Sequence, residues 1–151
     1  MRLAVLCMFV AAVLAGCQTT PQPPAQRPPD FAIGATVFPG PGSEGERYLV
    51  EPDGMLRAEF GGGVRPTDHP PRVRQLAAGE FNDLYTLALT TGLLDSTPSG
   101  RVNSPETFQP FENSVLVYYA YDGLRRYVEV TPEDERFGPL LERWRGWTWR
   151  R

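Results

Sequence analysis

Two Asp-Gly pairs constrain the fold of this 151-residue chain more than any other feature of its sequence. Asp53-Gly54 and Asp122-Gly123 each stand between two stretches in which apolar and polar residues alternate. Asp-Gly in this setting is the strongest short-range signal for a β-hairpin, because glycine adopts the positive φ angles that tight hairpin turns require. The sequence therefore predicts two hairpins.

The loop length of the first hairpin decides which of its residues face each other. A three-residue loop with Gly54 in the left-handed conformation places Val50 opposite Leu56. The same register sets Arg47 opposite Glu59, a favourable cross-strand pair on the solvated face. A two-residue loop would instead place Val50 opposite a charged residue, so the three-residue loop is predicted.

The Asp-Gly pair of the second hairpin suits a two-residue type I′ turn between residues 114–121 and 124–130. This register places four pairs on one face, namely Tyr121 with Leu124, Tyr119 with Arg126, Val117 with Val128, and Val115 with Val130. That face is the expected core. The opposite face carries Tyr118 across from Tyr127 and is expected to be solvated or covered by another element.

A helical pattern follows each hairpin. Residues 79–91 carry apolar side chains at helical spacing, and Gly92 is the expected end of that helix. The second helix is expected to begin with Gly138 as its cap and Pro139 in its first turn. Its apolar stripe at positions i, i+3, i+4 and i+7 consists of Phe137, Leu140, Leu141 and Trp144.

These elements predict an α+β fold of two layers. The expected order is β-β-α-β-β-α, with an antiparallel sheet made of the two hairpins and both helices on one face. Residues 31–45 are rich in Gly and Pro, so regular structure is expected only from Glu46, with a short extra strand at residues 72–76. At about 100 to 200 residues per domain, residues 31–151 form a single globular domain.

The first sixteen residues have the form of an export signal. Arg2 supplies a positive start, and residues 3–14 are uncharged and mostly aliphatic, which is shorter than the roughly 20 residues of a membrane span. The segment ends in Leu14-Ala15-Gly16-Cys17, which resembles the lipobox of bacterial lipoproteins. The resemblance implies removal of residues 1–16 and attachment of lipid to Cys17. The alternative is ordinary secretion with cleavage after Ala15 and a free thiol at Cys17.

The lipoprotein resemblance also implies a location. Because Gln18 is not the Asp that usually marks retention in the inner membrane, the expected place is the outer membrane, with the domain facing the periplasm; the periplasmic face of the inner membrane is the alternative. The expected tether is the lipidated cysteine with the Pro-rich stretch after it, residues 17–30. A polyproline chain of this length, at about 3.1 Å per residue, would reach roughly 40 Å from the lipid.

Little in the domain indicates catalysis. Cys7 lies in the signal and Cys17 would carry lipid, so no disulfide, zinc cluster or cysteine nucleophile is expected, and no cofactor or metal. The chain's only histidine, His69, follows Asp68 in a Pro-rich stretch where adjacent side chains diverge, and no G-x-S-x-G turn is present. The Gly-rich run 61–63 lacks the lysine and the following helix of a phosphate loop, since the chain has no Lys.

Three other segments leave alternatives open. The acidic run 133–135 is expected to be a solvated turn or a helix start. The long polar loop 96–113 is either functional or disordered. At the C-terminus, a candidate contact patch for membrane or an envelope partner comprises Trp147, Trp149, Arg150 and Arg151. Core packing of the tryptophans with a solvated basic tail is its alternative.

The functional expectation is a lipid-anchored module of the cell envelope that binds a partner and is not an enzyme. A net charge of −3 argues against nucleic acid as that partner. One alternative is a small periplasmic enzyme that uses loop carboxylates or His69. The other is an inert structural lipoprotein.

Overall fold

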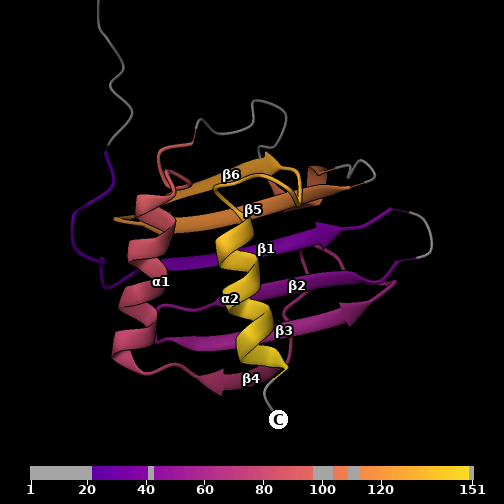
Figure 1. The fold of residues 1–151 in the computed structure, drawn as a ribbon, viewed down its shortest axis with the longest axis horizontal. Coiled ribbons are helices and arrows are strands. Elements are labelled where there is room, and N and C mark those ends of the chain that lie inside the picture. Colours follow the sequence, from indigo (N-terminus) through magenta and orange to yellow (C-terminus); the bar gives the residue numbers. More distant parts are fainter. Residues whose placement is uncertain (1–21, 41–42, 97–103, 109–112, 150–151) are drawn as a thin grey trace, which may run out of the picture.

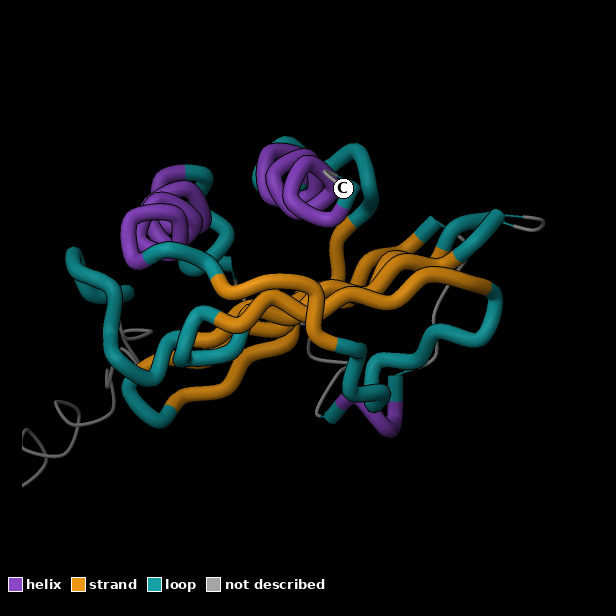
Figure 2. Tube along the Cα trace, turned by 90° about the horizontal axis from the view of Figure 1, so that it is seen from below, coloured by secondary structure: helices purple, strands orange, loops and turns teal. Residues whose placement is uncertain are grey.

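The computed structural model of this chain describes residues 22–40, 43–96, 104–108 and 113–149. They form a six-stranded antiparallel sheet with two helices on one face (Figure 1). The sheet is seen edge-on in Figure 2, with both helices on one side and loops on the other. The elements are β1 (Ala32–Phe38), β2 (Gly45–Val50), β3 (Met55–Gly61), β4 (Arg72–Gln75), α1 (Ala78–Thr90), the 3₁₀ helix η1 (Pro105–Thr107), β5 (Ser114–Tyr121), β6 (Leu124–Val130) and α2 (Gly138–Thr148). The expected α+β class with both helices on one face is confirmed.

The prediction of a sheet built from two hairpins alone is wrong. The strand order is β4-β3-β2-β1-β5-β6, so β1 lies between the hairpins and pairs with both of them. This strand, Ala32–Phe38, is buried on both faces along almost its whole length. A strand of this kind shows no alternation of apolar and polar residues, which is why its sequence does not reveal it.

The two hairpin registers are as predicted. Val50 faces Leu56 across a loop in which Gly54 has a φ of +82°. In the second hairpin all four expected core pairs form, and its turn residues, Asp122 and Gly123, have φ angles of +49° and +73°. The short extra strand is also confirmed, as β4 at the edge beside β3.

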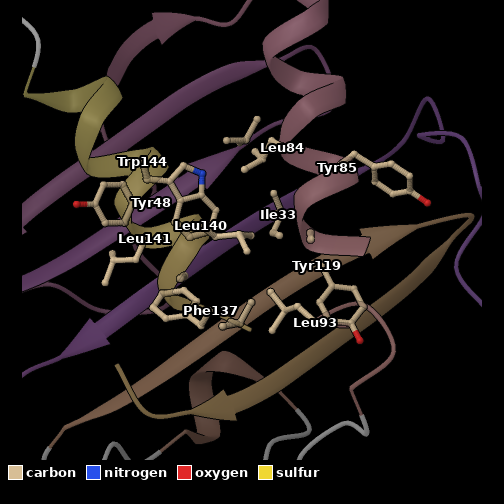
Figure 3. Packing of buried hydrophobic residues seen from close by; sticks show 14 of the residues in the cluster. Ile33, Tyr48, Leu84, Tyr85, Leu93, Tyr119, Phe137, Leu140, Leu141 and Trp144 are labelled. Carbon is tan, nitrogen blue, oxygen red and sulfur yellow. The ribbon is translucent and has the colours of Figure 1, made fainter. Parts of the chain in front are cut away.

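The core lies between the sheet and the two helices (Figure 3). Trp144 of α2 is fully buried and stacks on Tyr48 of β2, with ring centroids 5.5 Å apart and planes 15° from parallel. The predicted stripe of α2 is buried throughout, although Phe137 holds the cap position expected for Gly138. The end of α1 follows the prediction, because Gly92 has a φ of +74° and lets the Leu93 amide bond back to the helix.

The segment 22–30, expected to belong to a free tether, lies along the domain beside α1. The guanidinium of Arg27 stands 4.2 Å from the ring centroid of Phe81 and donates a hydrogen bond to the side chain of Asn82. The Tyr85 hydroxyl donates to the carbonyl of Pro24. Proline cannot donate hydrogen bonds but its carbonyl still accepts them, so a Pro-rich segment can dock on a helix without forming a strand.

Asp30 ends this segment and caps the turn of the second hairpin. Its two carboxylate oxygens accept hydrogen bonds from the backbone N–H groups of Asp122 and Gly123, each 2.9 Å long. These bonds, that to Gly123 first, lower the pKa of Asp30 below its ordinary value of 3.8. The carboxylate therefore stabilises the fold fully above about pH 4, and this contribution is lost as the pH falls through the lowered pKa.

We expect Asp30→Ala to lower the urea midpoint of unfolding at pH 6 and to matter less at pH 2.5, where a larger fraction of the wild-type carboxylate is protonated. Urea unfolding followed by circular dichroism at both pH values measures the difference. Asp83→Ala, at an exposed position on α1, is the matched control. A gap between wild type and Asp30→Ala that is equal at both pH values would contradict this role.

Candidate functional site

The sheet face opposite α1 and α2, here named the helix-free face, carries the candidate site. Because side chains alternate along a strand, Ile33 and Ala35 of β1 point to the helices while Gly34 and Thr36 point to the helix-free face. The connection between β3 and β4 and the short helix η1 lie over this face (Figure 2). They roof a hollow above the middle of the sheet.

This hollow, here named the Arg47 hollow, has a volume of about 220 Å³. Its floor and walls come from the central strands and its roof from the two overlying segments. The lining residues are Gly34, Ala35, Thr36, Arg47, Tyr48, Leu49, Pro66, Thr67, Pro105, Glu106, Leu116, Tyr118 and Tyr127. It thus combines a cation, a carboxylate, two threonines and the rings of Tyr118 and Tyr127, while the ring of Tyr48 stacks on Trp144 in the core.

Arg47 is the half-buried cation of the hollow. Its Nε donates to the carbonyl oxygen of Asp68 at 2.8 Å, and its Nη1 donates to the hydroxyl of Thr36 at 2.7 Å. Burial lowers the pKa of Arg47, against the nearby charges of Asp68 and Glu59, but a guanidinium stays protonated in proteins. None of the ion pairs between described residues includes Arg47. The two hydrogen bonds of Arg47 therefore go to neutral acceptors, while the carboxylates of Asp68 and Glu59 favour its charged form through space.

Tyr118 and Tyr127 form the aromatic wall. They face each other across β5 and β6, with ring centroids 5.5 Å apart. Burial raises the pKa of Tyr127, with a smaller effect from Tyr118, so its hydroxyl is neutral at neutral pH. On the other side, Tyr118 faces Gly34, which has no side chain to fill the floor.

A second, more open hollow of about 480 Å³ continues along the same face. It shares Leu49 and Tyr118 with the Arg47 hollow. Its other lining residues are Asp30, Ala32, Glu51, Pro52, Ala120, Gly123, Leu124 and Arg125. The helix-free face therefore offers two adjacent concave regions.

His69 lies at the margin of this face and does not pair with Asp68. Its Nε2 is 3.6 Å from a carboxylate oxygen of Glu51, and its side chain is 62% exposed. The other oxygen of Glu51 accepts a hydrogen bond from Arg57, and the Asp68 carboxylate accepts one from the Arg65 amide. The sole histidine is thus one member of a surface pair.

The candidate patch at the C-terminus divides into a buried part and an exposed part. Trp147 is 8% exposed, and the guanidinium groups of Arg74 and Arg143 lie 5.8 and 5.9 Å from its ring centroid. Trp149 is 72% exposed and its ring lies 5.4 Å from that of Phe60. Sequence reasoning missed Phe60 as a neighbour. Arg150 and Arg151 lie outside the described residues.

The remaining candidate segments lie at a strand end, in a turn or outside the described residues. The space around Gly61, Gly62 and Gly63 is open, as expected for residues at the end of a strand. Within the acidic run, Asp134 bonds the guanidinium of Arg136 in the turn before α2. Of the long loop 96–113, residues 97–103 and 109–112 lie outside the described residues, as does the lipobox with Cys17.

No group of three or more His, Cys, Asp or Glu side chains in the described part of the chain is placed to hold a metal ion. No helix among those residues has the length and apolar character to cross a membrane.

The Arg47 hollow is the functional candidate that sequence reasoning missed. The register correctly set Arg47 opposite Glu59, yet the guanidinium turns toward Thr36 on a strand that was not expected. A weak signal existed in the pairing of Tyr118 with Tyr127 on the second face of its hairpin. Comparison with known proteins adds no assignment: no family model matches the chain, and a search of curated proteins finds no match.

Proposed function

We propose that this chain is a lipid-anchored protein of the bacterial cell envelope, whose domain binds a partner through the helix-free face and does not catalyse a reaction. The observation that carries the anchor is Leu14-Ala15-Gly16-Cys17 directly after an export signal. By the same resemblance, the proposed location is the outer membrane with the domain in the periplasm.

Support for binding comes from the two adjacent hollows on a face that neither α1 nor α2 covers. Concave regions lined by apolar and aromatic side chains with a few polar groups are the usual form of ligand sites. A guanidinium, a hydroxyl and two tyrosines suit recognition by hydrogen bonds and ring packing. The histidine on which an enzyme would depend lies at the exposed margin, beside Glu51.

The anchor is tested by the mass of the mature N-terminal peptide. We expect a chain that begins at Cys17 and carries lipid. Several acyl chains hold a protein on a membrane far more stably than one. Because Cys17→Ser removes the residue to which the lipid attaches, we expect this variant to be lost from washed membranes. An unmodified Cys17, or a mature chain that begins at Gly16, would contradict the anchor.

The binding face is tested in the same cells with a photoreactive residue at position 125 or at position 142. Both native residues, Arg125 and Glu142, are exposed, but the first lines the larger hollow of the helix-free face and the second lies on α2, beside a hollow of about 510 Å³ on the opposite side of the domain. We expect a cross-linked envelope component from position 125 and none from position 142. Equal products from the two positions, or none from either, would count against the helix-free face.

A further inference from the structure

We infer that the Arg47 hollow binds a small monocarboxylate with a flat apolar body, its carboxylate on Arg47 and its body against Tyr118 and Tyr127. This inference rests on the proposed binding role of the helix-free face, and it does not depend on the lipid anchor.

The carboxylate end follows from the donors that Arg47 and Thr36 present. Arg47 uses Nε and Nη1 for Asp68 and Thr36, and its guanidinium carries further N–H donors on Nη1 and Nη2. The Thr36 oxygen accepts from Arg47, so its own hydrogen is available to donate. A half-buried guanidinium whose hydrogen bonds go to a carbonyl and a hydroxyl, beside a hydroxyl donor, is a site for an oxyanion.

The apolar end follows from the aromatic wall. Tyr118 and Tyr127 are tilted by 37° to each other, and Leu116 and Leu49 also line the hollow. Aromatic rings pack favourably against flat apolar groups, in stacked or edge-on arrangements. The volume of about 220 Å³ is below the range of drug-sized pockets, which limits the ligand to a small molecule with a single ring.

Glu106 supplies the charge selectivity. It lines the hollow from η1, and a hydrogen bond with the Ser104 side chain lowers its pKa, so it is ionised at neutral pH. A second negative charge on the ligand would be repelled by this carboxylate. The hollow is therefore expected to prefer a monoanion to a dianion of similar shape.

Arg47 also holds the β3–β4 connection through the carbonyl of Asp68, so a purely structural role must be distinguished from binding. Arg57 provides the matched control. It holds the same connection through the carbonyl of Pro70, at 3.1 Å, and it does not line the hollow. Loss of either arginine loosens the connection, whereas only Arg47 faces a ligand.

The test is a titration of the full-length protein in detergent with benzoate, benzamide and phthalate, followed by calorimetry and by NMR of the ligand. We expect saturable binding of benzoate, and binding at least about tenfold weaker for uncharged benzamide, because a charge-assisted hydrogen bond is lost. Phthalate should bind at least about twofold more weakly than benzoate. Glu106→Gln should reduce this difference in affinity between the two ligands.

The variants separate the two roles of Arg47. Arg47→Gln should weaken benzoate binding at least about tenfold, while Arg57→Gln should leave benzoate affinity unchanged within about twofold. If Arg47→Gln does not fold, two other measurements test the inference. These are the affinity of Tyr127→Leu for benzoate and the comparison of benzoate with benzamide on the wild-type protein. Equal affinity for benzoate and benzamide, absence of saturable binding, or full benzoate affinity in Arg47→Gln would overturn the inference. Cross-linking from position 125 would then still support the binding face, with a different ligand class.

Discussion

Replacing Trp144 with alanine is expected to lower the free energy of unfolding by about 3–5 kcal/mol. The indole is fully buried, stacks on Tyr48 and lies 6.2 Å from the ring of Phe137, centroid to centroid. Its removal leaves a cavity where α2 meets the sheet. Since domains of this kind are stable by about 5–15 kcal/mol, this one change removes a large share of the total.

Trp149→Ala is the matched control, because Trp149 follows the same helix but is mostly exposed. We expect it to change stability by no more than about 0.5 kcal/mol. Trp144→Phe should lower the free energy of unfolding less than Trp144→Ala does. The buried Nε1 of Trp144 has no hydrogen-bond partner among the described residues, so replacement by phenylalanine breaks no hydrogen bond. Urea unfolding followed by circular dichroism measures all three variants. Equal losses for Trp144→Ala and Trp149→Ala would contradict the core assigned to α2.

Gly34→Ala is expected to destabilise the domain by about 2–3 kcal/mol, the second largest effect. A Cβ at position 34 would lie 2.6 Å from the backbone oxygen of Tyr48 and 3.3 Å from the Cα of Leu49. Both atoms belong to β2, which cannot move away without breaking its ladder with the central strand. The same added methyl group would also occupy the floor of the Arg47 hollow.

The control for Gly34 is Gly63→Ala, since nothing lies within 4 Å of a Cβ at position 63. This change should be neutral or stabilise by up to about 1 kcal/mol, because alanine restricts the unfolded chain more than glycine does. Urea midpoints of the two variants give the comparison. A Gly34→Ala protein as stable as Gly63→Ala would show that β1 does not lie this close to β2.

The parts of the fold that sequence reasoning predicted depend on local signals. Gly54 and Gly123 define their turns, and the alternation on either side then determines each register. The stripe that contains Trp144 likewise repeats within one helix. The central strand has no such signal, because Ala32–Phe38 is apolar at nearly every position and is buried on both faces.

The site was less predictable than the fold for the same reason. The Arg47 hollow collects side chains from β1, β2, β5, β6 and two loops, and only the strand order brings them together. With β1 absent from the prediction, Arg47 had Glu59 as its expected partner. In the structure it bonds instead to Thr36 and Asp68, residues that neither hairpin contains.

The docking of residues 22–30 against α1 changes how far the domain can stand from a membrane. With Cys17 held in lipid as proposed, only five peptide units separate it from Gln22, and an extended chain of that length spans about 17 Å. The roughly 40 Å expected of a free polyproline segment is therefore not available. A domain held this closely would stay near the lipid headgroups, so a partner of the kind proposed would have to meet it at the membrane surface.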